Sequence, residues 1–543
     1  MKMNFKKIFS AVAAAAMLTA CVGDLNTIPL NPTDVTSETA YGADEAGYVQ
    51  GLAKIYFQLV SNNTQDLEVA DGGASEFIRA FWSTQEVTAD AAKCAWGDAW
   101  VNDLNNNTWK GDVLNDAVYA VYVRTLQGIT YVNEYLRQTS DANLSTRGCS
   151  DAVKAKVQEY RAEARFLRAY FYWAAMDTFG QVPFSTENTQ FGGGYNPPQA
   201  PATEIFNFIV SELTDLASED SAMPAAQSNY PRADKGSCLG LLARVYLNAE
   251  VYTGTAMWAE AKKACEDIYA LGYKLAPTHA ELFRGDNGEN PDAKGEFLFA
   301  ASYDAENTQS YGGTTYLTLS TLSGDDGAVN ITGINGGWAG NRVPYEYVAK
   351  FFTDVKNPDY ETGEYTNTDK RADYFFIKGR TESMEGNLNT FLNGWSCIKF
   401  NNVPHDMDAV EYAATAATKN YADIDWPLIR LGEIHLIYAE ACMHAGGDAS
   451  AQVKALADRA GVAAPAAITE DFLFEERARE LMWEAHRRTD LIRFGKWIEG
   501  YNWTYKGGNF KGQDLPEHFN VFPVPSTELA TNLDLQQNPG YAR

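Results

Sequence analysis

The stretch DAVKAKVQEYRAEARFLRAYFYWAAMDTFGQVPF, residues 151–184, decides how the chain folds. Apolar or small residues recur in steps of three and four, at Val153, Val157, Tyr160, Ala164, Leu167, Phe171 and Ala174. Such steps place side chains on one face of an α-helix. Gly180 and Pro183 then disfavour its continuation. We therefore predict a long helix over residues 151–177 that buries one face.

Outside this stretch, pairs of shorter helical patterns follow one another. LGLLARVYLN (239–248) precedes WAEAKKACEDIYAL (258–271), with a polar turn at 253–255 between them. LGEIHLIYAEACMH (431–444) and residues 452–459 repeat the arrangement, and residues 120–136 are a candidate for a partner helix. A small residue three positions before a tyrosine, as in Ala243 and Tyr246, is typical of tetratricopeptide hairpins. The spacing between copies is irregular, so we predict degenerate hairpins inside a globular chain.

Three other stretches lack helical periodicity. Residues 185–204, 276–345 and 354–425 are rich in Gly, Asn, Thr, Asp and Pro. Long ordered loops of this kind usually carry function on a rigid scaffold. The predicted fold class is mainly α, with tetratricopeptide-like hairpins supporting a loop-rich, mixed segment. The predicted division is 1–20, a signal peptide; 21–275, a helical region; 276–425, the loop-rich segment; and 426–543, a second helical region.

The amino terminus has the pattern of an export signal. Lys2, Lys6 and Lys7 precede a short apolar stretch, residues 8–17, which is too short to span a bilayer. The stretch ends in Leu-Thr-Ala-Cys, residues 18–21, a pattern that a bacterial lipoprotein peptidase cuts before the cysteine. We predict that Cys21 becomes the lipid-bearing first residue; the alternative is an ordinary secretory signal with a chance cysteine. No later run approaches 18 apolar residues, so the lipid on Cys21 is the expected membrane attachment.

Charge and titratable residues narrow the function classes. The chain carries 71 acidic against 44 basic residues, a formal charge of -27, which repels the phosphates of nucleic acids. Cleavage after residue 20 removes three lysines and leaves 41 − 71, or −30. The six later cysteines form no CxxC pair, which favours buried free thiols over disulfides, and the six scattered histidines give no zinc motif. Residues 286–289 and Asp325-Asp326 offer oxygen ligands for calcium, but neither has EF-hand spacing, so we favour solvated loops and expect no cofactor.

Aromatic residues exceed what a helical core needs. They make up 13% of the chain, with 12 Trp, 30 Tyr and 27 Phe, which leaves rings for a binding surface. Five tryptophans lie in or beside apolar helical patterns and are expected in the core: Trp173, Trp258, Trp426, Trp483 and Trp497. The sequence around Trp82 and Trp100 is compatible with either the core or a binding surface.

Several blocks, in chain order, resemble the SusD/RagB family of bacterial surface lipoproteins. They are AEARFLRAY (162–170) closed by FGQVPF (179–184), RADK (232–235), RLGE (430–433), EERAREL (475–481) leading to RRTDLIRFG (487–495), and FPVP (522–525) followed by QNPGY (537–541). The matches run nearly end to end, which makes coincidence implausible. Charged residues of these helices, such as Glu163, Arg165 and Arg168, are expected to form structural ion pairs.

This resemblance implies a SusD-like fold and a non-catalytic glycan-binding protein on the extracellular face of the outer membrane. Such a protein passes oligosaccharides to a SusC-like TonB-dependent barrel. Within the family the sequence is closest in appearance to the starch binders, in which an arc of aromatic rings cups an α-glucan beside an arginine. The corresponding positions here are Arg79, Trp96 with Asp98, Tyr311 in Tyr-Gly-Gly, and Trp338 in Asn-Gly-Gly-Trp. The stretch from Tyr311 to Trp338 departs from the family pattern by its acidic pair, Asp325-Asp326, and by a few extra residues.

The chemistry of these residue types supports such a site independently. The C–H faces of a pyranose lie flat on indole or phenol rings, and its hydroxyls need donors such as Arg and acceptors such as Asp. An acidic surface favours a neutral glucan over an acidic polysaccharide. The alternatives are a different neutral glycan, a glycoside hydrolase with two carboxylates about 5 to 10 Å apart, and a scaffold whose hairpins bind a protein.

Overall fold

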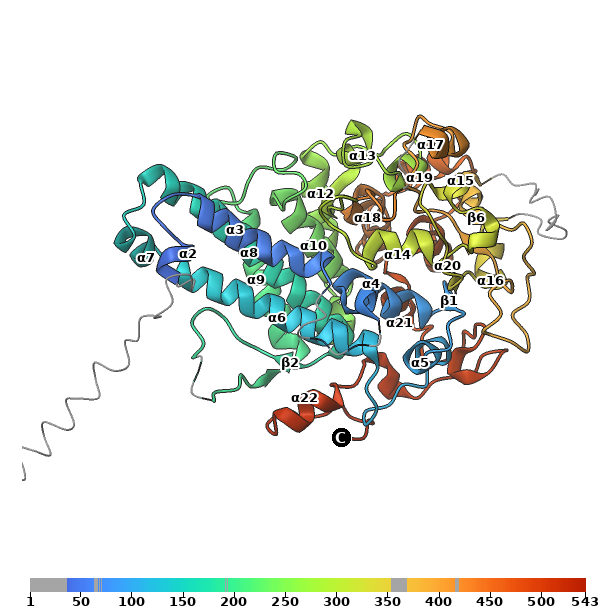
Figure 1. The fold of residues 1–543 in the computed structure, drawn as a ribbon, viewed down its shortest axis with the longest axis horizontal. Helices are drawn as coiled ribbons and strands as arrows, with labels where there is room; N and C mark the ends of the chain where they lie inside the picture. Colours follow the sequence, from blue (N-terminus) through green and yellow to red (C-terminus); the bar gives the residue numbers. More distant parts are fainter. Residues whose placement is uncertain are drawn as a thin grey trace, which may run out of the picture.

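The computed structural model describes residues 37–62, 67, 69, 71–190, 192, 194–352, 369–415 and 419–543. Its longest helix in these ranges, α8 (Asp151–Phe179), confirms the helix predicted over 151–177. The Ser150 side chain caps it by accepting from the Val153 N–H, and it ends at Gly180, whose φ is +70°. Helix α8 packs between α6 (Asp116–Gln138) and α9 (Ala202–Ala217), while α3 (Ala46–Val60) lies along both α6 and α8. These helices form the elongated arm at the left of Figure 1.

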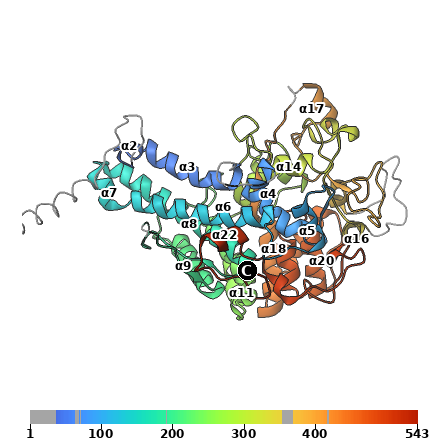
Figure 2. The ribbon, with the colours of Figure 1, turned by 60° about the horizontal axis from the view of Figure 1, so that its bottom comes forward.

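The predicted hairpins follow the arm. Helix α10 (Lys235–Leu247) packs against α12 (Trp258–Ala270), with the short α11 (Ala249–Thr253) before the predicted turn. Helix α12 packs in turn on α18 (Leu431–Ala445), which contacts α19 (Ser450–Ala460) and α20 (Glu470–Glu480). Helices from the two halves of the sequence therefore form one continuous stack. In Figure 2 the green helices of the first half lie beside the orange helices of the second.

The described strands form four small antiparallel pairs. They are β1 (Lys93–Cys94) with β5 (Asn341–Arg342), β2 (Val182–Pro183) with β3 (Gln199–Ala200), β4 (Phe297–Ala301) with β8 (Trp426–Arg430), and β6 (Phe375–Phe376) with β7 (Ser396–Cys397). The β4–β8 pair ties the loop-rich segment to the second helical region. The β1–β5 pair joins two loops that are more than 240 residues apart in sequence.

Short helices occur in the remaining chain, including the predicted loop-rich segment, residues 276–425. They are α2 (Ser37–Ala40), α4 (Phe77–Trp82), α5 (Ala99–Asn106), α7 (Asp141–Thr146), α13 (Pro291–Glu296), α14 (Gly313–Leu319), α15 (Val329–Thr332), α16 (Tyr345–Val348), α17 (Ala409–Thr415), α21 (Arg487–Arg493) and α22 (Ser526–Thr531). The main hydrophobic core runs from Tyr48 to Leu535 and crosses the predicted boundaries at 275 and 425. The division into functional segments therefore stays a prediction.

The burial of the tryptophans and cysteines agrees with most of the predictions about the core. Nine of the twelve tryptophans are buried: Trp82, Trp100, Trp109, Trp173, Trp395, Trp426, Trp483, Trp497 and Trp503. Trp258 packs against the core as predicted but lies at its edge, because its ring is only half-buried and stacks on His444 with ring centres 4.3 Å apart. The six described cysteines are free and buried.

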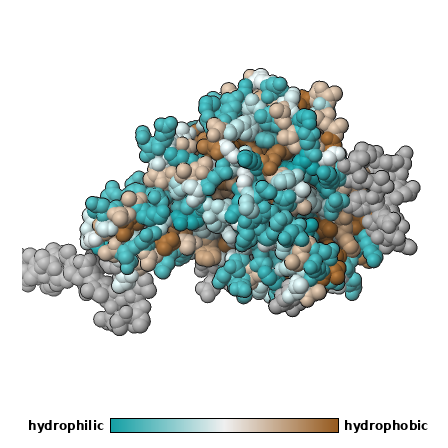
Figure 3. Space-filling model, turned by 90° about the horizontal axis from the view of Figure 1, so that it is seen from above, coloured by the Kyte–Doolittle hydropathy of each residue, from teal (hydrophilic) through white to brown (hydrophobic). Residues whose placement is uncertain are grey.

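The predicted structural ion pairs are present. Glu163 pairs with Arg232, and Arg165 and Arg168 both reach Glu212 on α9, at 2.8 and 2.9 Å. These pairs fix α8 against its neighbours. Hydrophilic side chains dominate the face seen in Figure 3, broken by smaller apolar patches. Within the described ranges, no helix has the length and apolar character needed to cross a membrane.

Candidate functional site

The pairing of β1 with β5 brings two of the predicted site residues together. Trp96 follows β1, and Trp338 precedes β5. The Ala95 N–H donates to the Gly340 carbonyl at 2.9 Å, which extends the pairing toward the tryptophans. The Trp96 indole N–H then donates to the Trp338 carbonyl, also at 2.9 Å. The backbone of one loop thus fixes the ring of the other.

Tyr311 completes a group of three rings with Trp96 and Trp338, which we call the aromatic platform. Its ring centre lies 5.9 Å from that of Trp338, at an interplanar angle of 63°. Tyr311 is 49% exposed, and both tryptophans are half-buried. Only three of the twelve tryptophans, Trp96, Trp258 and Trp338, are not buried, and two of them lie here. The platform therefore accounts for part of the aromatic excess in the composition.

Arg79, on α4, lies beneath the platform. Its guanidinium carbon is 4.3 Å from the ring centre of Tyr316 and 5.5 Å from that of Trp96. It donates to the Tyr311 carbonyl at 3.3 Å and pairs with Asp71 at 2.6 Å. Arg79 is only 1% exposed, whereas the Asp71 side chain is 46% exposed. Arg79 therefore holds the platform from below, and its partner Asp71 is the member of the pair that faces solvent.

A buried carboxyl group, Glu76, supports the loop that carries Tyr311. It accepts hydrogen bonds from the hydroxyls of Tyr303 and Ser310. Complete burial raises the pKa of Glu76 to about 7, although these hydrogen bonds and nearby arginines act to lower it. A Cβ at Gly312 would lie 1.7 Å from the Glu76 Oε2 atom, so only glycine fits at this position. The first glycine of the Tyr-Gly-Gly sequence is thus required by the close approach of the loop to Glu76.

The structure also shows residues that sequence reasoning missed. Tyr421 places its ring centre 5.2 Å from that of Tyr311 and tilts by 40° from it. Tyr316 and Glu76 lie beneath the platform, whereas Asp71 pairs with Arg79 and faces solvent. These residues carry no local motif, and only the fold brings them together. Of the predicted residues, Asp98 is exposed at the start of α5, and its sugar contact stays a prediction, as does direct sugar contact by Arg79.

The other candidate positions add no ring to the platform, although Ser323, which Asp326 binds, forms a β-bridge with Trp338. Asp326 pairs with Arg380 at 2.6 Å and closes a turn with Ser323, so its oxygens already have partners. Asp286, His405 and Asp406 offer ligand atoms within 4.8 Å of one another. Cys21 lies outside the described residues.

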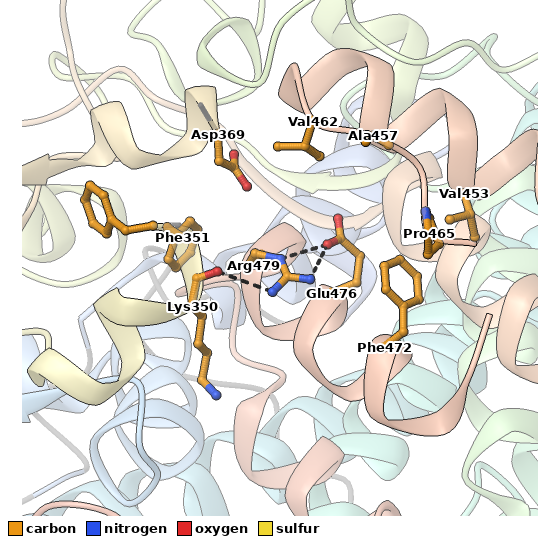
Figure 4. A pocket seen from close by; sticks show the side chains of 12 residues that line it. Lys350, Phe351, Asp369, Val453, Ala457, Val462, Pro465, Phe472, Glu476 and Arg479 are labelled. Carbon is orange, nitrogen blue, oxygen red and sulfur yellow. Dashed lines mark hydrogen bonds and ion pairs between the residues drawn. The ribbon is translucent and has the colours of Figure 1, made fainter. Parts of the chain in front are cut away.

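A cavity of about 210 Å³ opens between α19, α20 and residues 350–352 (Figure 4). Its charged side chains are engaged with neighbours: Arg479 contacts Glu476 at 2.9 Å and the Lys350 carbonyl at 3.3 Å. The Lys350 amine pairs with Glu475 at 2.8 Å. Much of the remaining wall is apolar, so this cavity offers little to a hydroxyl-rich ligand.

Family models match two parts of the chain. The model described as "SusD family" matches residues 295–541, and the model described as "Starch-binding associating with outer membrane" matches residues 62–247. The first covers the Tyr311 and Trp338 loops, and the second covers the Trp96 loop. The platform is therefore built from both matched regions.

Relatives match over the full length. The starch-binding protein SusD of Bacteroides thetaiotaomicron is 31% identical, with 99% of both chains covered. A crystal structure of a SusD superfamily protein from Parabacteroides distasonis has a TM-score of 0.69 at 21% identity, covering 94% of this chain and 100% of that one. The surface glycan-binding protein A of B. thetaiotaomicron, solved with laminarihexaose, has a TM-score of 0.67 at 17% identity, covering 91% and 99%. The end-to-end match in sequence and fold shows that this chain belongs to the SusD family of glycan-binding proteins associated with the outer membrane.

Proposed function

We propose that this protein captures neutral glucans of the starch type on its aromatic platform and does not cleave them. The observation that carries the proposal is the convergence of Trp96, Tyr311 and Trp338, from three loops, into one partly exposed group of rings. Flat sugar faces stack on such rings. The 31% identity to a starch-binding protein over the whole chain supports starch as the ligand.

Polar groups beside the rings supply partners for sugar hydroxyls. Asp71 and Asp98 are exposed carboxylates that accept hydrogen bonds. Because Arg79 pairs with Asp71, it holds that carboxylate in place. If each stacked ring contributes about 1 kcal/mol, three rings with a few hydrogen bonds reach millimolar to micromolar affinity. Such affinity suits capture followed by release.

The cellular role follows from the family and the amino terminus. A lipid on Cys21 would hold the protein on the extracellular face of the outer membrane, from which it would deliver oligosaccharides to a SusC-like TonB-dependent barrel. The acidic composition disfavours acidic polysaccharides. A different neutral glycan is the second candidate, because a protein of the same fold was solved with laminarihexaose.

Affinity electrophoresis in gels containing soluble starch tests the proposal. We expect retardation of the wild type, and no retardation of a Trp96→Ala/Trp338→Ala double variant. Trp258→Ala is the matched control, because Trp258 is also half-buried but stacks on His444, away from the platform. Retardation of the double variant equal to wild type would refute the platform.

Further assays on the wild-type protein distinguish glycan capture from the other function classes. Incubation with starch should release no reducing sugar; release that one Asp or Glu substitution abolishes would establish a hydrolase. Wild type that is not retarded by starch or by any other neutral glucan would favour a protein-binding scaffold. Retardation by a β-glucan alone would support the second candidate ligand.

A further inference from the structure

A polar cavity of about 720 Å³ lies beside the aromatic platform. The residues that line it include Tyr230, Tyr412, Lys294, Lys419 and Glu306. It is larger than the cavity at α19 and α20, and polar atoms dominate its surface. Neither its size nor its composition is explained by the platform described above.

Two structural connections place this cavity next to the platform. Lys419 lines the cavity and is two residues from Tyr421, so their Cα atoms are at most about 7 Å apart. The Lys419 carbonyl accepts from the Asn335 N–H at 3.0 Å, in the loop that carries Trp338. Tyr303, another lining residue, donates to Glu76 beneath Tyr311. The wall of the cavity and the support of the platform therefore share residues.

Tyr421 lies on the segment that links the two features. Its ring neighbours Tyr311 at 5.2 Å, and the chain continues from it to Asp423, which lines the cavity. The rings of Trp338, Tyr311 and Tyr421 follow one another, because Tyr311 neighbours both of the others. A sugar chain laid along these rings would extend toward the cavity.

The cavity chemistry fits a saccharide better than a cation. Asp423 accepts from the Ala305 N–H at 3.1 Å and pairs with Lys419 at 2.5 Å. Asp425 accepts from the Tyr230 hydroxyl at 2.5 Å and from the Tyr303 N–H at 2.8 Å. Asp423 and Asp425 are therefore already paired or hydrogen-bonded within the protein, so these two carboxylates are not bare ligands for a metal ion. Tyrosine faces and mixed donors and acceptors are the groups that a neutral sugar contacts.

We propose that this cavity is a second saccharide-binding subsite, which receives the part of a long glucan that extends past the platform over Tyr421. The proposal rests on the proposed function, because it needs a glucan on the platform. We therefore expect the affinity for a glucan to grow with the length of the glucan, since only a long chain contacts both the platform and the cavity.

Isothermal titration with maltotriose and maltoheptaose tests this subsite. We expect wild type to bind maltoheptaose about fivefold or more tightly than maltotriose, the equivalent of about 1 kcal/mol from the added contacts. Ser302→Trp fills the cavity from an exposed lining position and should lower the maltoheptaose affinity to that of maltotriose, with maltotriose binding unchanged. Tyr421→Ala, which removes the linking ring, should act in the same direction.

Ser145→Trp on α7 is the matched control, because Ser145 is also exposed and α7 lies at the far end of the helical arm (Figure 1). It should bind both sugars like wild type. Equal affinity of wild type for both sugars, or full maltoheptaose affinity in Ser302→Trp, would overturn the subsite while leaving the platform intact. A Ser302→Trp variant that loses maltotriose binding while its unfolding temperature is unchanged would place both sugars in one site and also overturn it. Wild type that binds neither sugar would refute the proposed function itself.

Discussion

Beneath the platform, an acidic residue, Glu76, and a basic residue, Arg79, are buried close to each other. Glu76 and Arg79 lie close enough for the Arg79 charge to lower the pKa of Glu76, yet burial dominates and raises it to about 7. Both groups contact the loop of Tyr311: Glu76 through Ser310, and Arg79 through the Tyr311 carbonyl. The exposed ring is therefore held by buried polar contacts.

The Glu76 carboxyl group should make stability depend on pH. Its pKa is about 7 in the folded protein and near 4.5 in the unfolded chain, so the folded state binds the extra proton between these values. Stability from this group is therefore greatest at low pH and falls as pH rises from about 4.5 to 7, by about 3 kcal/mol. We expect Glu76→Gln to lack this loss. Unfolding temperatures measured from pH 5 to pH 8 check it, and parallel curves for the two proteins would contradict it.

The residues of the site differ in how far sequence could predict them. Trp96, Tyr311 and Trp338 were identified through a family resemblance, and the structure brings all three together. Tyr421 was missed, because it lies 110 residues from Tyr311 in a loop with no distinctive motif. Arg79 was predicted beside the rings, but its burial and its pairing with Asp71 depend on tertiary packing.

At the scale of elements, the crossing of α6 and α8 depends on one small residue. A Cβ at Gly128 of α6 would lie 2.6 Å from the Phe171 ring of α8. Alanine normally stabilises a helix by about 1 kcal/mol relative to glycine. Here overpacking should outweigh this gain and lower the free energy of unfolding by about 1–3 kcal/mol.

Chemical denaturation of Gly128→Ala measures this effect. Gly295→Ala on α13 is the control, because a Cβ there meets no atom within 4 Å. The control should be neutral or slightly stabilised. A Gly128→Ala variant as stable as wild type would show that the two helices can move apart without cost.

Helices and strands were not equally predictable. The helical periodicity of residues 151–177 sufficed to predict α8, because many residues repeat one pattern. Strands β1 and β5 contain two residues each, too few for any alternation, and their pairing spans more than 240 residues. The elements that build the platform were therefore the least visible in the sequence.

At the scale of the whole molecule, a buried ionic cluster joins its distant parts. Arg430, at the end of β8, contacts Glu296 at 2.9 Å, Glu480 at 2.8 Å and Glu484 at 2.6 Å. All four side chains are 1% exposed or less. The cluster connects the loop-rich segment with the second helical region and adds to the β4–β8 pairing.

Removing Arg430 from this cluster should strongly destabilise the protein. We expect Arg430→Met to lower the free energy of unfolding by about 3–5 kcal/mol, because the three buried carboxylates then share only the remaining cations, such as Arg459 and Lys399. Lys454→Met is the control, because the Lys454–Asp458 pair is solvent-exposed and should contribute about 0–1 kcal/mol. Equal loss in the two variants, measured by urea denaturation, would contradict a dominant role for the buried cluster.

We expect the aromatic platform to bind a neutral glucan. A glycan array probed with residues 21–543, the predicted mature protein, and with the Trp96→Ala/Trp338→Ala variant of the same residues tests this binding. We predict that wild type binds neutral α-glucans and no acidic polysaccharide, and that the double variant binds neither. Binding of the double variant equal to wild type, or binding of wild type to acidic polysaccharides alone, would contradict the claim.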